Sequence, residues 1–193
     1  MPSDNAVLRS GLRAARRAIP ASQRLAAAEA LSARLLSLPF APVEGHVAGY
    51  WALDGEIALH RWQVRLPKRL VYCLPVLHRD KRLRFAPWRA GDALATNRYG
   101  IPEPDVDPES ALPAQAMSLV AMPLVGFDET GHRLGMGGGW YDRSLESRRG
   151  SAPPPWLVGV GFDCQQVASL DAAEWDVRPD AICTETRTLL ASA

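Results

Sequence analysis

The run MSLVAMPLVGF, at residues 117–127, contains no charged side chain and is apolar at nearly every position. Strands that are buried on both faces of a sheet have this pattern, whereas strands with one face in water alternate apolar and polar residues. Shorter runs of the same kind occur at 46–53, 69–76 and 156–162. These runs predict a mostly parallel β-sheet that is covered on both faces.

The segments around these runs carry helical patterns. An apolar stripe at helical spacing precedes Pro20 and consists of Leu8, Leu12, Ala15 and Ile19. Ser22 is a candidate N-cap for a second, alanine-rich helix that Pro39 closes. The segment 56–66 is long enough for a helical crossover between the first two strands, which makes a βαβ unit. Strands that alternate with helices predict an α/β fold, with residues 1–193 as a single domain.

The remaining segments complete this prediction. The run 82–88 alternates, as expected for an edge strand or a hairpin arm, and 181–186 is the last strand candidate. A further helix is expected to begin at Trp140. Because proline is frequent in 97–113, we predict no regular structure there.

The charge balance and the cysteines restrict the class of protein. Lys and Arg number 22 and Asp and Glu 21, which gives a formal net charge of +1, so nothing directs the whole protein to nucleic acid or to an anionic membrane. No run approaches the roughly 20 apolar residues of a membrane span, and the N-terminal segment lacks the apolar core of a secretion signal. Cys73, Cys164 and Cys183 lack C-x-x-C spacing, so we expect buried free thiols in a cytoplasmic protein.

The stretch RLGMGGGWYDR, at 133–143, follows a buried strand and precedes a predicted helix, which is where α/β proteins bind ligands. Its glycines allow several backbone N–H groups to turn toward one point, and such an arrangement suits a phosphate group. The stretch is not a Walker A loop, which needs a lysine and a hydroxyl residue after its last glycine, nor the dinucleotide fingerprint, which needs a glycine at Trp140. A tight turn that uses glycine for its positive φ is the alternative.

Charged side chains flank these glycines. Arg133 and Arg143 are placed to neutralise phosphoryl oxygens, and Asp142 is placed in the first helical turn to hold Mg²⁺ between phosphates. Phosphoryl transfer needs such a cradle, cation and metal. The alternatives are solvated surface charges for the two arginines and, for Asp142, an acid that stabilises the helix N-terminus.

The longer stretch PLVGFDETGHRLGMGGGWYDRSL, at 123–145, closely resembles the signature of the 5-formyltetrahydrofolate cyclo-ligases, also called 5,10-methenyltetrahydrofolate synthetases. The resemblance covers nearly the whole chain. Further segments that resemble the family occur in the family's order at 8–19, 50–57, 71–76, 97–104 and 174–185.

The resemblance implies a fold related to the phosphosugar isomerase and CoA-transferase group, in a protein that is monomeric or a weak dimer. It also implies an ATP- and Mg²⁺-dependent conversion of 5-formyltetrahydrofolate into 5,10-methenyltetrahydrofolate, with release of ADP and phosphate. ATP would phosphorylate the formyl oxygen, and the folate N10 would then attack. The residues that it implies for ATP are Asn5, Arg9, Arg133, Leu134, Gly135, Met136, Gly137, Gly138, Gly139, Trp140 and Tyr141, and those for Mg²⁺ are Asp142 and Asp176.

The same resemblance assigns Trp51, Glu56 and Tyr141 to the folate. We predict that Glu56 and Arg143 are catalytic: Glu56 would orient the folate and take the proton from N10, and Arg143 would neutralise the phosphoryl group. Without the resemblance, a glutamate after a glycine is usually a turn residue or the acid at a helix start, and Asp176 is typical of a surface acid at a helix end.

One position departs from the family. Counted from Arg9, the family's pattern K-x-x-L-R places Asn5 where a lysine or arginine contacts the nucleotide. Arg13 or Arg16 can compensate from a nearby helix face; alternatively, Arg13, Arg16 and Arg17 form a solvated basic face. Two other functions stay open, namely a non-catalytic nucleotide- or folate-binding protein and a sugar-phosphate isomerase or sensor on the same fold.

Overall fold

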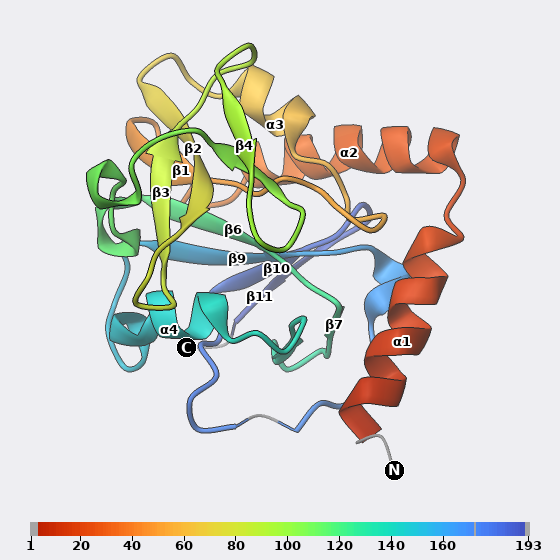
Figure 1. The fold of residues 1–193 in the computed structure, drawn as a ribbon. Helices are drawn as coiled ribbons and strands as arrows, with labels where there is room; N and C mark the ends of the chain where they lie inside the picture. The colour runs from red at the N-terminus through yellow and green to blue at the C-terminus, as the bar shows by residue number, and fades with distance from the viewer. Residues whose placement is uncertain (1–3, 172, 192–193) are drawn as a thin grey trace.

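The computed structural model describes residues 4–171 and 173–191, and its centre is a seven-stranded sheet (Figure 1). The strands of this sheet are β1 (Gly45–Ala48), β2 (Leu70–Leu77), β3 (Leu83–Pro87), β6 (Leu119–Pro123), β9 (Trp156–Val160), β10 (Ala181–Cys183) and β11 (Thr188–Leu190). They lie in the order β11-β10-β9-β6-β1-β2-β3, in which the five inner strands are parallel and the two edge strands antiparallel. The predicted mostly parallel sheet, with 82–88 at its edge, is confirmed.

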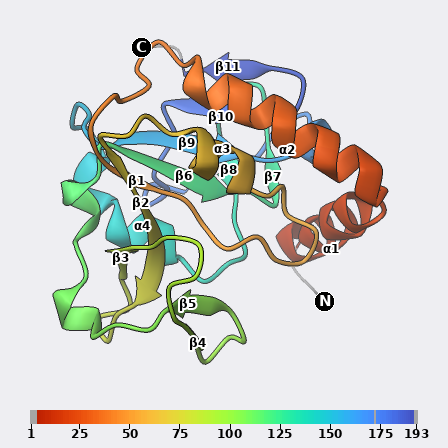
Figure 2. The same ribbon diagram turned by 90° about the horizontal axis from the view of Figure 1, so that it is seen from above.

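Helices cover both faces of this sheet. Figures 1 and 2 show α2 (Ala21–Leu36) and α3 (His60–Arg65) on one side of the sheet and α4 (Trp140–Ser144) on the other. Alternate residues of each strand point to opposite faces, so Val47 of β1 belongs to the core cluster that contains Leu31 of α2, whereas its neighbour Ala48 belongs to the cluster that contains Leu145, just after α4. Both faces are therefore apolar, as the unbroken apolar runs predict.

The first helix, α1 (Asp4–Arg17), lies beside the sheet and packs through Leu12 against Val125 and Leu134. Leu134 belongs to the short hairpin of β7 (Gly126–Phe127) and β8 (Arg133–Leu134), which leads into the glycines. The run 117–127 is thus not one strand: β6 ends at Pro123, and the chain turns away to form this hairpin. No helix among the described residues is long and apolar enough to cross a membrane.

One local prediction about helices is wrong, and the predicted helical crossover is confirmed over a shorter range than the segment 56–66. Ser22 is not the N-cap of α2, because the helix begins at Ala21 directly after Pro20 and no side chain caps it. The crossover helix is confined to His60–Arg65, since the chain at 53–57 is held in a turn: Glu56 N donates to Leu53 O at 2.8 Å, and the Tyr50 hydroxyl donates to Ile57 O at 2.6 Å. The segment before α3 therefore belongs to the candidate site and not to the helix.

The proline-rich segment also differs from its prediction. Leu94–Thr96 (β4) and Pro102–Pro104 (β5) form an antiparallel hairpin, and 3-10 turns follow at Pro108–Ser110 and Ala114–Ala116. Both prolines of β5 are tolerated because the hairpin has only two strands, so their missing N–H groups can face away from the ladder. The side chain of Asn97 organises the connecting turn by accepting from Tyr99 N at 2.9 Å and Ile101 N at 3.1 Å.

Cys73 and Cys183 are buried free thiols, as expected; Cys164 is also a free thiol but is exposed, so only its predicted burial is wrong. Cys164 lies in the 3-10 turn Asp163–Gln165, where Gln165 occupies the interior instead. The Gln165 amide donates to Leu124 O at 2.6 Å and to Val125 O at 2.9 Å, and these bonds turn the neighbouring cysteine outward.

Gly49, which follows β1 and leads into the candidate site, has no room for a side chain. A Cβ there would lie 2.0 Å from the Tyr72 hydroxyl oxygen, so Gly49→Ala is expected to lower the free energy of unfolding by about 1–3 kcal/mol. Gly11→Ala is the control: Gly11 lies inside α1 with nothing within 4 Å of its Cβ position, and alanine there should add about 0.5–1 kcal/mol. Urea denaturation measures both, and equal shifts of the same sign would contradict the packing described here.

Candidate active site

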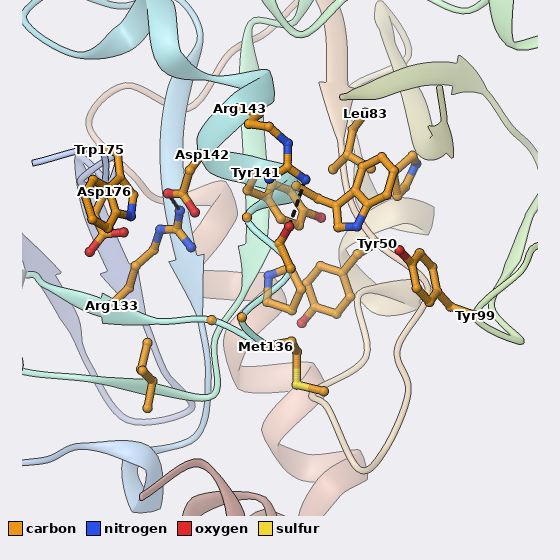
Figure 3. Close-up of a pocket in the computed structure, with 18 of the residues that line it drawn as sticks. Tyr50, Leu83, Tyr99, Arg133, Met136, Tyr141, Asp142, Arg143, Trp175 and Asp176 are labelled. Atoms are coloured by element: carbon orange, nitrogen blue, oxygen red, sulfur yellow. Dashed lines mark hydrogen bonds and ion pairs between the residues drawn. The ribbon is translucent and has the colours of Figure 1, made fainter. Parts of the chain in front are cut away.

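A cavity of about 840 Å³ opens where the parallel strands β1, β2 and β6 end. Tyr50 and Trp51 follow β1 on its wall, Leu77 ends β2, and Pro123 ends β6. Ligands of α/β proteins bind at this edge of the sheet because the loops that follow the strands converge there. Figure 3 shows aromatic and charged side chains from several of these loops around the cavity.

The glycine loop, residues 135–139, forms one side of this cavity. Gly137 and Gly139 have φ values of +91° and +64°, which side-chain-bearing residues rarely adopt, and a Cβ at Gly139 would lie 2.7 Å from Arg143 Nη1. The turn therefore needs glycine for its backbone conformation, as the alternative interpretation requires, and it also faces the cavity. Because α4 has only five residues, its contribution to an anion site is limited to the N–H groups of its first turn.

Two arginines from outside hold the glycine loop in place. Arg9 of α1 donates from Nε to Gly135 O at 2.8 Å. Arg143 of α4 donates from Nη2 to Gly138 O at 2.8 Å and from Nε to Lys81 O at 2.8 Å, and its guanidinium carbon lies 5.5 Å from the centre of the Trp140 ring. Both arginines line the cavity, so the loop is cationic at each end.

Arg133 and Asp142 form an ion pair on the cavity wall, with side chains 7% and 18% exposed (Figure 3). The pair is tied to the chain at Val177, whose N–H donates to Asp142 Oδ1 at 3.1 Å and whose carbonyl accepts from Arg133 Nε at 3.1 Å. Asp142 is therefore more than the acid of a helix start: it joins β8, α4 and the segment around Val177.

Asp176 comes to the same cavity from the C-terminal part of the chain. Its Oδ2 accepts from Ala173 N at 2.9 Å, which fixes the turn over 173–176. In the described residues no group of three or more His, Cys, Asp or Glu side chains is arranged to hold a metal ion. Asp142 and Asp176 are thus two separate carboxylates on one wall, as Figure 3 shows.

Glu56 lies at the cavity with a side chain that is only 12% exposed. Its Oε2 accepts from Leu53 N at 3.0 Å. Burial raises the pKa of Glu56 above its ordinary value, and the hydrogen bond from Leu53 and the charge of Arg16 oppose this rise without cancelling it. Burial and the nearby Glu56 carboxylate also raise the pKa values of Tyr50 and Tyr141, so both phenols stay protonated at neutral pH.

The structure brings all the site residues predicted from the sequence to this one cavity. They are Asn5, Arg9, Trp51, Glu56, Arg133, Leu134, Gly135, Met136, Gly137, Gly138, Gly139, Trp140, Tyr141, Asp142, Arg143 and Asp176. The role of each toward ATP, folate or Mg²⁺ stays a prediction.

Arg13, Arg16 and Arg17 do not take the place of a cation at Asn5. All three form ion pairs with Asp54, and none of them lines the cavity. The alternative of a solvated basic face is also wrong for Arg16, whose side chain is 1% exposed. These arginines of α1 instead contact Asp54 in the turn that carries Glu56.

The β4–β5 hairpin contains no predicted site residue, although its NRYGIPEP segment resembles the family. The cavity is also lined by Asn97, Tyr99, Ile101 and Glu103. The ring of Tyr99 meets that of Trp140 edge to face at 6.1 Å between centroids. Trp175 also lines the cavity and is 67% exposed; its place next to Asp176, within the segment 174–185 that resembles the family, is the sequence signal that could have indicated it.

The chain is similar to known proteins of one family. The model of the 5-formyltetrahydrofolate cyclo-ligase family matches residues 2–185. The chain belongs to this family. A cyclo-ligase of Escherichia coli K12 is 36% identical over 181 residues, which are 91% of this chain and 97% of that protein, and one of Haemophilus influenzae is 33% identical over 174 residues, 88% of this chain and 91% of that protein. The family suggested by the signature at 123–145 is thereby confirmed.

Solved structures agree with this assignment. A 5,10-methenyltetrahydrofolate synthetase of Aquifex aeolicus superposes with a TM-score of 0.81 at 26% identity, over 98% of this chain and 93% of that one. A synthetase of that name from Mycoplasma pneumoniae has a TM-score of 0.71 at 20% identity, over 94% of this chain and 99% of that one, and shows the likeness of fold. The residues that the structure describes therefore have the fold of these synthetases, and the relation of this fold to the phosphosugar isomerase and CoA-transferase group stays a prediction.

Proposed function

We propose that this protein catalyses the ATP-dependent conversion of 5-formyltetrahydrofolate into 5,10-methenyltetrahydrofolate, with release of ADP and phosphate. The observation that carries the proposal is the meeting of the glycine loop and Glu56 in one cavity. The cavity thereby offers backbone donors for a triphosphate and a buried carboxylate for a second substrate. Membership of the cyclo-ligase family supports this choice of substrates.

The first step activates the formyl group. The formyl oxygen on N5 attacks the γ-phosphorus of ATP, the bond from that phosphorus to the β–γ bridging oxygen breaks, and ADP leaves, so that an iminium phosphate forms. Catalysis of such a transfer is mostly positioning and charge neutralisation. The N–H groups of the glycine loop, with Arg9 and Arg143 at its two ends, supply both.

The second step closes the ring. N10 attacks the formyl carbon, N10 loses its proton, and the bond from that carbon to the phosphate oxygen breaks, which leaves the methenyl bridge. Glu56 takes the proton or orients N10, and its raised pKa suits a base better than that of a solvated carboxylate. Trp51 and Tyr141 form the wall along the folate, and both phenol and indole can donate a hydrogen bond to it.

Mg²⁺ bound to ATP would draw charge from the phosphoryl group during transfer. Asp142 and Asp176 fit this ion, since Mg²⁺ is usually held by one or two carboxylates together with phosphates and water. Each has one carboxylate oxygen that makes no hydrogen bond within the part of the chain that the structure describes. The phosphates of ATP would supply the remaining ligands.

We further propose that the enzyme works in the cytoplasm as a monomer or weak dimer and without nucleic acid. The formal net charge of +1 supports the last point.

Arg9→Met tests the role of α1 in nucleotide binding. The variant removes a charge and the bond from Nε to Gly135 O, which spans 2.8 Å, so the KM for ATP is expected to rise about tenfold while the KM for folate stays near its normal value. Arg17→Met is the control, because Arg17 is on the same helix but pairs with Asp54 outside the cavity. Steady-state kinetics with each substrate varied separately measures both constants, and an unchanged KM for ATP in Arg9→Met would contradict this role.

The proposed function itself is tested by mixing the purified protein with 5-formyltetrahydrofolate, ATP and Mg²⁺ and following the absorbance of the methenyl product. We expect a signal only when both substrates are present, with one ADP released for each methenyl group. A protein that merely binds nucleotide or folate would retain ATP without turnover, and a sugar-phosphate isomerase would act without consuming ATP. Either result would reject the cyclo-ligase activity.

A further inference from the structure

A charged side chain is buried directly behind the cavity wall. Arg16, in the last turn of α1, is 1% exposed and contacts two other segments of the chain. It donates from Nε to Asp54 O at 2.9 Å and from Nη1 to Leu124 O at 3.2 Å, and its Nη2 pairs with Asp54 Oδ2 at 3.0 Å. A cation is costly to bury unless every donor has a partner, so its presence needs a reason.

The fourth contact of Arg16 supplies this reason. Its Nη2 lies 3.7 Å from Glu56 Oε1, which is too long for a strong hydrogen bond but close enough for charge attraction. The other oxygen, Oε2, accepts from Leu53 N at 3.0 Å. The Glu56 carboxylate is thus held by an N–H group at one oxygen and by a buried cation near the other, and the cavity lies beyond it.

The turn that presents Glu56 also depends on α1. Asp54 has a φ of +52° and Gly55 of +78°, so two successive residues are left-handed, which is unfavourable for Asp54. The Asp54 carboxylate pairs with Arg13, Arg16 and Arg17, and these bonds hold it in this conformation. Of the three arginines, Arg16 alone also contacts Glu56 among the ion pairs of the described residues.

We propose that Arg16 is a positioning residue for the cyclo-ligase reaction: from behind the cavity wall it fixes the place of the Glu56 carboxylate. The inference rests on the proposed function, because turnover is its readout. The same helix, α1, also contacts the glycine loop through Arg9. One helix therefore positions residues on both the nucleotide side and the folate side of the cavity.

The charged and titratable groups around Glu56 determine in which direction each substitution should shift its pKa. Arg16 and Arg13 of α1 favour the ionised form and lower the pKa of Glu56, whereas burial and the Asp54 carboxylate raise it. Tyr50 and Tyr141 face it from the ends of β1 and α4, and both stay protonated because burial raises their own pKa values. Removal of Arg16 should therefore raise the pKa of Glu56, and neutralisation of Asp54 should lower it.

The test compares Arg16→Met with Arg17→Met in the pH profile of kcat/KM for the folate, with the enzyme-free reaction subtracted. Arg17 is a matched control, since it lies on the same helix and pairs with the same Asp54 but does not contact Glu56. We expect Arg16→Met to move the acid limb of the profile upward by about one pH unit, and Arg17→Met to leave it in place. An acid limb at the same pH in both variants would overturn the inference.

Asp54→Asn adds a result of opposite sign. It removes the carboxylate that competes with Glu56 for Arg16, so the acid limb should move downward. A merely structural role would lower the activity of both variants without moving their limbs in opposite directions. Arg16→Lys replaces Arg16→Met if the latter does not fold; it keeps the charge and is expected to raise the folate KM while the acid limb stays in place. Asp54→Asn then decides, because an acid limb that moves upward or stays in place in that variant overturns the inference. A wild-type protein without turnover would instead reject the proposed function.

Discussion

Asp142→Asn is expected to lower turnover about 100-fold at millimolar Mg²⁺, with partial recovery at high Mg²⁺. An asparagine keeps an acceptor for Val177 N but loses the charge that a magnesium ion needs, so the loss should follow the ion and not the nucleotide alone. The measurement is kcat as a function of Mg²⁺ concentration at saturating ATP. Activity equal to that of the wild type at low Mg²⁺ would mean that the metal binds elsewhere in the cavity.

The same substitution removes the partner of Arg133, and the loss of that ion pair must be separated from the loss of metal. Asp180→Asn is a matched control, because Asp180 pairs with Arg148 as Asp142 pairs with Arg133. The side chains of the two aspartates are 21% and 18% exposed, and those of both arginines are 7% exposed. Asp180 does not line the cavity. Both variants should lose about 3 kcal/mol of unfolding free energy, because each leaves a buried guanidinium unpaired, and only Asp142→Asn should acquire the new dependence on Mg²⁺.

The sheet could be predicted from the sequence because its inner strands are buried on both faces. The runs that contain Val120 and Leu157 are apolar at nearly every position, whereas a strand with one face in water alternates apolar and polar residues. The same reasoning predicted the glycine loop at the ligand-binding edge of the sheet, and it lies there, although the hairpin of β7 and β8 separates it from β6. The apolar pattern does not give the end of a strand, which is why 117–127 was extended beyond Pro123 into the hairpin of β7 and β8.

Arg16 could not be predicted as a buried residue. A helical pattern identifies the apolar face of α1 by Leu8 and Leu12, and an arginine on a neighbouring face is assigned to water by default. Its burial depends on Asp54, which is 38 positions away in the sequence and meets it only in the folded chain. A charge pair of this kind leaves no periodic signal in one sequence.

The β4–β5 hairpin was missed for a different reason. Its strands have three residues each, and Pro102 and Pro104 are residues that normally disfavour a strand. Glu103 ties the hairpin to β2 by accepting from Leu77 N at 3.1 Å, and it also accepts from Asn97 Nδ2 at 3.0 Å within the hairpin. Since the bond to β2 is tertiary, the cavity wall that Tyr99 forms became visible only in the structure.

Glu56→Gln is expected to lower turnover on the order of 100- to 10,000-fold, the range that a positioned base contributes. The amide keeps the shape of the side chain and an acceptor for Leu53 N, so the fold of the turn should persist. If Glu56 takes the proton from N10, kcat falls with little change in the folate KM; if it only orients the folate, KM rises instead. Full turnover at saturating folate would reject both roles.

The same variant has a second expected effect, on stability, with a sign that is independent of the assay. Burial raises the pKa of Glu56 in the folded state above its unfolded value of 4.5. Below pH 4.5 Glu56 is protonated in both states, so its ionisation does not lower the free energy of unfolding there. As the pH rises from 4.5 through the folded pKa, the unfolded chain ionises first and the wild type loses stability. Glu56→Gln does not ionise, so its Tm relative to the wild type should be higher at pH 7 than at pH 4. A higher Tm together with lost turnover would mean that the buried carboxylate is kept for the reaction, at a cost to the fold.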